Sequence, residues 1–392
     1  MTVQGAIALM NTRTKVVVAG FRPQICQVLE KKNLPYVIWT SQPVKSKRLA
    51  EYILVENFCE TPEKIQTIAA KLKSFGPFSH VIAGTEESVV AASYLRRALN
   101  TRLSEHSIAK SCHDKLIMKQ KLKSFDIPMN DFFYLGEKHN SQEIFDQFGT
   151  PVVVKERTFS GGKNLKFVTK PNELDGLKSK DKIAERYNDA QEASVESFIQ
   201  NGEILFTNVT HYHTLGSINL VPADYDSSLI KEILSLNQRV ISNLKIHWGL
   251  THLEMYLTKS GPYFGEIAIR PPGGYIMDLI GLSYDFDAWE AFVSIELGIP
   301  FDFPKKFTQY SAAWILHPGE GKVKSIEGLD QIKLLPEIVK IKLKAKPNSI
   351  IEKRASVGKD IGYIKLSSPS HSQLLNTLKY CQDNLKIEMQ KK

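Results

Sequence analysis

The amino-acid sequence predicts a mixed α/β and α+β fold, in which a domain with a parallel sheet precedes domains rich in antiparallel strands. The first third of the 392-residue chain alternates short apolar strands with helical segments, which is the pattern of parallel strands joined by crossover helices. Strand patterns then dominate residues 151–270, and residues 311–387 mix short strands with a final helix. A chain of this length exceeds one ordinary core, so we expect two or three closely packed domains.

The N-terminal strands are expected at residues 15–20, 36–39 and 80–84, each a short apolar run. A helix is expected at residues 23–32, directly after the first strand. The intervening turn, Gly20 to Pro23, holds one glycine and lacks the spacing of a dinucleotide fingerprint, so a nicotinamide-dinucleotide site is not supported here. Later helices are predicted by their apolar periodicity at residues 114–125, 142–148, 171–177, 228–244, 285–297 and 370–385.

Composition and charge narrow the classes of partner. The chain is 42% hydrophobic and 24% charged, as in soluble globular proteins, and no stretch approaches the roughly 20 apolar residues of a membrane span. The net charge is +9, but the basic residues are spread along the chain without interleaved aromatic residues. We therefore expect no nucleic-acid or membrane partner. Scattered cysteines and the absence of a signal-peptide pattern predict a cytoplasmic protein.

A lysine within a valine-rich strand is the first candidate site feature. Lys155 ends the run Val152-Val153-Val154, and the Ser160-Gly161-Gly162 loop follows before a second strand at residues 165–168. A lysine in such a strand is costly unless its ammonium group meets an anion, and backbone N–H groups of a glycine loop can approach phosphate oxygens. An ordinary hairpin with a surface lysine is the alternative.

Two glutamates form a more specific pattern. Residues 252–257 and 263–270 alternate like strands on either side of the turn at residues 258–262. If Leu257 pairs with Tyr263, Glu254 lies directly opposite Glu266, and Arg270 shares their face. Carboxylates that face each other across a ladder repel unless a cation lies between them, and paired carboxylates suit Mg²⁺. The glycine pair Gly273-Gly274 then offers N–H groups beside Arg270 for an anion.

Two further patterns carry less information. Residues 195–204 form an apolar strand with an acid, Glu196, followed by a turn and a second acid, Glu203; an ordinary strand and turn is the favoured explanation. His211 and His213 share one face of a strand and could bind a transition metal. No third ligand is evident, so we favour packed or substrate-facing histidines.

Taken together, these residues resemble the ATP-grasp superfamily, and within it the carboxylate–amine ligases that include L-amino-acid ligases. The resemblance implies that Lys115 and Lys155 hold nucleotide phosphates under the loop of Ser160, Gly161 and Gly162. It implies an adenine edge at Glu196, Ser197 and Ile199 and a ribose contact at Glu203. Glu254 and Glu266 match the two magnesium glutamates, and Arg270 the arginine near the reacting acyl group. Ala268 stands where many relatives carry a further asparagine ligand, which leaves the number of metal ions open.

The resemblance also implies an organisation and an activity. It implies a pre-ATP-grasp α/β domain at residues 1–110, an ATP-grasp domain at 111–310 with a lid at about 130–200, and a C-terminal closing subdomain at 311–392. The expected cofactors are ATP and Mg²⁺, with Mn²⁺ as a possible substitute. The expected reaction joins a small carboxylic acid to an amine, such as an amino acid, through an acyl phosphate. Arg270 and Lys155 would act in catalysis, and Arg270, Gly273 and Gly274 would bind the substrate.

Two other functions remain open on the sequence alone. The same fold could activate bicarbonate as an ATP-dependent carboxylase, which bicarbonate-dependent ADP release would reveal. Ala268 would also fit a regulatory protein that binds ATP without turnover. The sequence names neither the acid nor the amine, and a homodimer is the commonest assembly to consider.

Overall fold

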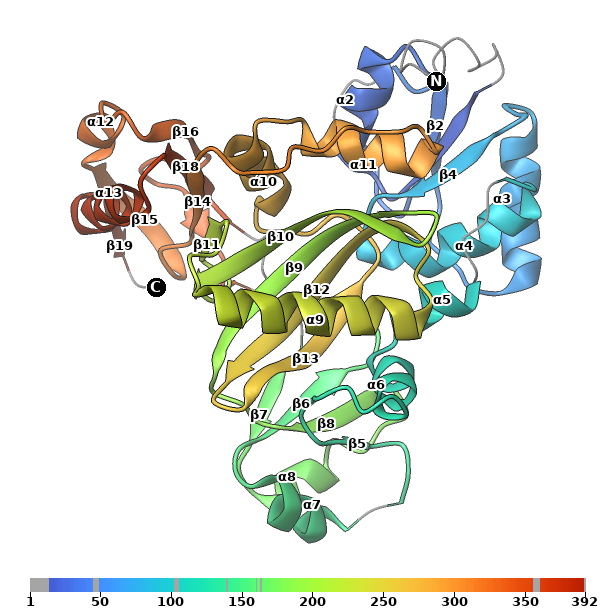
Figure 1. Cartoon of the computed structure of the whole chain (residues 1–392), viewed down its shortest axis with the longest axis horizontal. Coiled ribbons are helices and arrows are strands. Elements are labelled where there is room, and N and C mark those ends of the chain that lie inside the picture. Colours follow the sequence, from blue (N-terminus) through green and yellow to red (C-terminus); the bar gives the residue numbers. More distant parts are fainter. Residues whose placement is uncertain are drawn as a thin grey trace.

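The N-terminal unit, a small lid and a sheet-based body are the three parts of the computed structural model (Figure 1). The lid lies at one end of the body, and the N-terminal unit and the C-terminal region lie on opposite flanks. Within the residues that the structure describes, every helix is too short or too polar to traverse a lipid bilayer. The structure describes residues 14–44, 49–101, 106–138, 140–159, 161–162, 164–354 and 360–390.

A four-stranded parallel sheet forms the N-terminal unit, as predicted, with the order β3-β2-β1-β4. The central strand β1 has no exposed side chains, because Val16 and Val18 pack toward helix α2 while Val17 and Ala19 pack toward α3 and α4. Strand β3 adds an edge that the sequence did not predict. The elements are β1 (Val16–Ala19), α2 (Pro23–Lys31), β2 (Tyr36–Thr40), β3 (Tyr52–Val55), α3 (Pro62–Lys73), β4 (His80–Ala83) and α4 (Val89–Ala98).

The order of these strands creates a crevice between β1 and β4. The chain winds outward from β1 to β2 and β3, then returns to place β4 on the other side of β1. Ligands of open α/β sheets bind outside the carboxyl ends of the strands at such a reversal. Gly20 and Gly84 follow the two strands there, and a β-carbon on Gly84 would lie 2.4 Å from the Gly20 carbonyl oxygen. The close approach of the two chain segments therefore requires glycine at position 84.

The lid is a four-stranded antiparallel sheet with the order β5-β8-β6-β7, backed by two helices. Alternate valines of β6, Val152 and Val154, pack with Ile144 and Phe148 of α7 in its core. Its last strand ends at Arg186, before the end of the expected lid at about residue 200. Its elements are β5 (Phe132–Tyr134), α7 (Ser141–Phe148), β6 (Val152–Glu156), β7 (Lys166–Val168), α8 (Pro171–Asp175) and β8 (Lys182–Arg186).

An eight-stranded sheet with the order β13-β12-β9-β10-β11-β14-β18-β16 forms the body, and its paired strands are antiparallel. Helix α9 lies along one face (Figure 1), where its Ile233 and Val240 share a core with Val195 and Leu253 of the sheet. The strands are β9 (Gln191–Gln200), β10 (Glu203–Thr214), β11 (Ile218–Val221), β12 (Trp248–Thr258), β13 (Gly261–Ala268), β14 (Tyr310–Leu316), β16 (Ile338–Leu343) and β18 (Gly362–Ser368). The helices are α9 (Ser227–Leu244), α10 (Ile276–Tyr284) and α11 (Ala288–Leu297).

The C-terminal region continues this sheet. Strand β14 begins at Tyr310 and pairs directly with β11, so the boundary expected at 310/311 falls inside a continuous sheet. A second, three-stranded sheet and two helices complete the region. They are β15 (Gly321–Glu327), α12 (Leu329–Ile332), β17 (Ile350–Ile351), α13 (His371–Asn384) and β19 (Lys386–Gln390). The short helices α5 (His106–Ser111) and α6 (Lys115–Lys123) connect the N-terminal unit to the lid.

Candidate functional site

Glu254 and Glu266 face each other across the β12–β13 hairpin, as predicted. The turn is offset by one residue from the expected closure, because Leu257 pairs with Pro262 rather than with Tyr263. An irregularity in the ladder beside Glu254 restores the register of the two glutamates. Gly265 permits it, since a β-carbon there would lie 2.9 Å from the Glu254 carbonyl oxygen.

A buried polar network forms hydrogen bonds with Glu254. The His252 ring contacts Glu254 Oε1 at 3.3 Å and Glu196 Oε1 at 2.9 Å, and the Tyr212 hydroxyl donates to Glu254 Oε1 at 3.1 Å. Burial opposes a charged imidazolium, but the hydrogen bonds to Glu196 and Glu254 outweigh it and raise the pKa of His252 to about 9. Burial likewise opposes the Glu254 carboxylate, but the hydrogen bond from His252 lowers the pKa of Glu254 to about 2. Glu254 is therefore a preoriented anion.

Three lysines and two glutamates line up between the lid and the hairpin. Lys115 Nζ lies 3.1 Å from Glu266 Oε2, and Lys155 Nζ lies 2.9 Å from Glu185 Oε2. Lys119, only 1% exposed, approaches the other oxygen of Glu185 at 3.4 Å. Burial would raise the pKa of Glu185, but Lys119 and Lys155 outweigh burial and lower it to about 2. Glu185 thus forms ion pairs with both Lys119 and Lys155.

Local capping explains why Lys115 points into this group. Asp114 caps helix α6 by accepting hydrogen bonds from the N–H groups of Leu116 and Ile117. Arg157, just beyond β6, donates to the same carboxylate through Nε at 3.1 Å. The cap therefore fixes the start of α6 against the end of the lid strand, with Lys115 in the first turn.

Two cavities meet at the facing glutamates. The lid cavity, of about 560 Å³, lies between the lid sheet and the hairpin. The inner cavity, of about 270 Å³, lies between the hairpin, the N-terminal crevice and the C-terminal part of the sheet. Both are bordered by Glu254, Glu266, Gly161, Leu215 and Gly216. The lid cavity also contains Lys115, Lys155, Gly162, Glu185, Tyr187, Glu192 and Tyr256.

The glycine loop lies where the two cavities join. Gly161 and Gly162 have φ values of 69° and 67°, in the left-handed region that favours glycine. Ser160 of the same predicted loop lies outside the described residues. Gly161 borders both cavities, so the loop is placed over the point where a group could pass between them.

Arg270 lies in the inner cavity together with an acid from the N-terminal unit. Its Nε donates to Glu86 Oε2 at 2.6 Å, and His113 Nδ1 lies 2.8 Å from the other oxygen of Glu86. Burial opposes the Glu86 carboxylate, but Arg270 and His113 outweigh it and lower its pKa to about 2. Gly273 and Gly274 border the same cavity. Glu86 follows β4 at the crevice between β1 and β4, and the sequence pattern did not predict it.

The residues predicted as the adenine edge lie apart from the lid cavity. Glu196 is fully buried in the large sheet, where Ser194, Asn208 and Thr210 donate hydrogen bonds to its carboxylate. Ser197 and Ile199 are also fully buried, and Glu203 is exposed at the start of β10. None of these four side chains borders the lid cavity. Glu185 and Glu192, which have the same seven-residue spacing as Glu196 and Glu203, border it instead.

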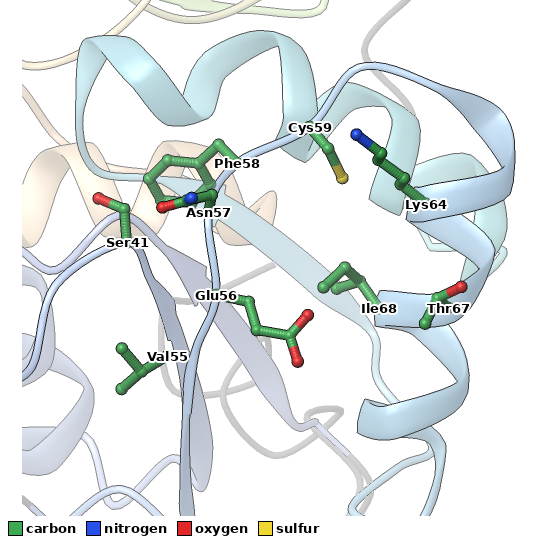
Figure 2. Close-up of a pocket in the computed structure, with 9 residues that line it drawn as sticks. All are labelled: Ser41, Val55, Glu56, Asn57, Phe58, Cys59, Lys64, Thr67 and Ile68. Atoms are coloured by element: carbon green, nitrogen blue, oxygen red, sulfur yellow. The ribbon is translucent and has the colours of Figure 1, made fainter.

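Other candidate features lie apart from this centre. The His211 and His213 rings are 5.7 Å apart, but the described residues hold no group of three metal-binding side chains. A further cavity of about 490 Å³ opens between the ends of β2 and β3 and helix α3 (Figure 2). Glu56 on its wall is paired with Lys71. No predicted site residue borders this cavity.

Comparison with known families tests the resemblance. The family model described as the ATP-grasp domain matches residues 120–280, and that of the L-amino acid ligase C-terminal domain 2 matches residues 313–390. Residues 120–280 therefore belong to the ATP-grasp domain family. Together the two matches confirm the expected carboxylate–amine ligase class for this ATP-grasp chain.

Similar proteins support this membership. An L-arginine-specific L-amino acid ligase of Bacillus subtilis is 23% identical over 334 residues, which cover 80% of this chain and 81% of the relative. The crystal structure of an L-amino acid ligase from Bacillus licheniformis aligns with a TM-score of 0.81 at 18% identity, covering 96% and 99% of the two chains. N5-carboxyaminoimidazole ribonucleotide synthetase from Thermotoga maritima aligns with a TM-score of 0.74 at 17% identity, covering 96% and 100%. The ATP-grasp fold expected from the sequence is confirmed.

The acid Glu192 of the ATP-grasp lid cavity gives a prediction on stability. Burial and the neighbouring Glu254 and Glu266 carboxylates raise its pKa to about 7. A carboxyl group with a raised folded-state pKa binds more protons folded than unfolded, so its contribution to stability falls as pH rises from about 4.5 to about 7. The natural chain should therefore lose stability as pH rises from about 5 to about 8, and Glu192→Gln should lose less, because glutamine does not titrate.

Thermal unfolding of the ligand-free protein at the two pH values measures this difference. Glu203→Gln is the matched control, because Glu203 is exposed outside the cavity. Equal pH dependence in the natural chain and Glu192→Gln would contradict the assigned titration.

Proposed function

We propose that the chain is an ATP-dependent ligase that joins a carboxylic acid to an amine through an acyl phosphate, releasing ADP and phosphate. The observation that carries the proposal is the pair Glu254 and Glu266 at the junction of two cavities. One cavity contains Lys115 and Lys155, whose ammonium groups can bind a polyphosphate, and the other contains Arg270 and a glycine pair, which can bind a carboxylate. A group transferred from one ligand to the other would pass between the two glutamates.

The donor set fits Mg²⁺. Glu254 and Glu266 supply paired hard oxygen ligands, and Mg²⁺ is commonly bound by one or two carboxylates together with substrate phosphates. When bound there, the ion supplies charge neutralisation for the phosphate oxygens. Ala268 contributes no ligand, so the two glutamates would hold the metal without a third side chain.

ATP is assigned to the lid cavity. Lys115 and Lys155 would bind its phosphates, and the N–H groups of Gly161 and Gly162 would cover them. We assign the base and ribose to the wall formed by Glu185, Tyr187 and Glu192, in place of Glu196 to Glu203. Tyr187 is 42% exposed at this wall, which leaves its ring free to contact a planar base.

The acid is assigned to Arg270, Gly273 and Gly274 in the inner cavity. A carboxylate oxygen attacks the γ-phosphorus and ADP departs, which converts a poor electrophile into an acyl phosphate. The amine nitrogen then attacks the acyl carbon, the carbon–oxygen bond to phosphate breaks, and the nitrogen loses a proton. Because both steps are displacements, positioning and charge stabilisation by these residues would supply most of the catalysis.

The test is nucleotide turnover with pooled amino acids and small acids. We expect ADP and phosphate to form in equal amounts with an amide product, only when an acid and an amine are both present with ATP and Mg²⁺. AMP and pyrophosphate as products would contradict the acyl-phosphate route. ADP release that depends on bicarbonate would favour the carboxylase, and ATP binding without turnover on any mixture would favour the regulatory protein.

A further inference from the structure

Arg22 is a partly buried cation that borders the inner cavity without an acidic partner among the described residues. It occupies the N-cap position of α2 at the crevice between β1 and β4. Its Nη2 donates to the carbonyl oxygens of Pro271 and Pro272 at 3.3 and 3.0 Å, and its guanidinium lies 5.4 Å from the centre of the Trp289 ring. Its Nε is buried and has no hydrogen-bond partner in the described part of the chain. Uncharged groups therefore fix this guanidinium without neutralising it.

The other charged side chains of the inner cavity already form ion pairs. Arg270 is paired with Glu86, which also contacts His113. Glu254 is held by His252, and Glu266 by Lys115. Asp278, whose charge favours the protonated form of Arg22, is itself bonded to Lys365 at 2.8 Å. Among the described residues, Arg22 is therefore the arginine of this cavity that forms no ion pair.

Burial and the nearby Arg270 lower the pKa of Arg22 to about 10, although Asp278 partly opposes this. Arg22 remains charged at neutral pH. A buried guanidinium without an anion is costly, and a planar carboxylate is its natural complement. The cavity is thus prepared for an anionic group contributed by a ligand.

We propose that Arg22 binds the α-carboxylate of the amino acid that acts as the amine in the ligase reaction. The inference rests on the proposed function and assigns a specificity-determining residue to its second substrate. Arg270 and the glycine pair come just after β13, the strand that contains Glu266, and so we assign them to the carboxylate that is phosphorylated. Arg22 enters the cavity from the N-terminal unit and binds the carboxylate of the second substrate.

The experiment varies the substrate and the residue together. With a saturating acyl donor identified by the turnover screen, the amine is supplied either as an L-amino acid or as its carboxamide, which lacks the α-carboxylate and cannot itself be activated. For the natural chain, we expect the KM for the carboxamide to exceed that for the amino acid by at least about tenfold. In Arg22→Gln, the KM for the amino acid should rise by about the same factor while that for the carboxamide stays nearly constant.

The carboxamide is the internal control for folding, because a misfolded variant would lose activity with both amines. Arg22→Lys should recover part of the discrimination, and Arg97→Gln, an exposed arginine of the same unit, should retain all of it. A higher KM for the acyl donor in Arg22→Gln, or unchanged discrimination between the two amines, would overturn the role of Arg22 alone. A natural chain that forms no ADP with any amino acid would instead overturn the proposed function and this inference with it.

Discussion

Replacing Glu266 with glutamine is expected to lower amide formation by a factor of about 100 to 1,000. The substitution keeps the size of the side chain but removes one of two facing carboxylates, so Glu254 is left as the single anionic ligand of the hairpin. It also removes the partner of Lys115, whose ammonium lies 3.1 Å from Glu266. Because the Glu266 side chain is 28% exposed, glutamine can be solvated there and the fold should persist.

The loss is measured as ADP and amide formed at increasing Mg²⁺ concentrations. We expect the apparent Mg²⁺ affinity and the maximal rate to fall together. Glu203→Gln provides the matched control, since Glu203 is exposed and borders neither cavity. Full activity of Glu266→Gln at ordinary Mg²⁺ concentrations would remove the proposed metal site.

The combined change Lys119→Met and Lys155→Met is expected to destabilise the fold by about 3–5 kcal/mol, more than the sum of the two single changes. Each lysine alone can neutralise Glu185, which is only 1% exposed and contacts both ammonium groups. Removing both leaves a buried carboxylate without a cation beside it. Lys155→Met alone should instead weaken ATP binding while the fold stays intact, because Lys119 still compensates Glu185.

Chemical unfolding of the two single variants and the double variant measures this coupling. Adding Glu185→Gln to the double variant should restore much of the lost stability, because glutamine carries no charge in the buried site. Strictly additive effects of Lys119→Met and Lys155→Met would show that the lysines do not share Glu185.

The hairpin illustrates what alternation along a sequence can predict. The period of two placed Glu254, Glu266 and Arg270 on one face, and the structure pairs the glutamates as predicted. The assumed turn closure was nevertheless one residue in error. The irregularity permitted by Gly265 compensates for that error, and such irregularities are difficult to infer from alternation alone.

The residues predicted as the adenine edge show that spacing alone cannot choose between two similar pairs of glutamates. Glu185 and Glu192 are separated by seven residues, and so are Glu196 and Glu203. The distinguishing signal was the apolar character of residues 193–199, which identifies a strand in the middle of the large sheet. A glutamate there needs internal partners, and Glu196 finds them in Asn208, Thr210 and His252. Glu185 and Glu192 lie instead on either side of the connection between the two sheets.

The contribution of the N-terminal unit could not be predicted from local pattern. Arg22 and Glu86 lie on short loops after β1 and β4, more than 180 residues before Arg270 in the chain. Their convergence depends on the reversal of strand order between β1 and β4 and on the docking of that crevice against residues 270–274. Both are tertiary properties. A sequence with an unremarkable Gly-Phe-Arg-Pro turn gives no sign of them.

The continuity of the large sheet across position 310 has a consequence for how the chain melts. Strands β14, β18 and β16 extend the ladder that begins at the β12–β13 hairpin, so C-terminal residues complete a framework started more than a hundred residues earlier. Cutting the chain before β14 would leave the backbone of β11 as a bare edge, a template for pairing between molecules. The C-terminal region should therefore melt in one cooperative transition with the body, and fragments lacking it should aggregate rather than persist as an independent nucleotide-binding piece.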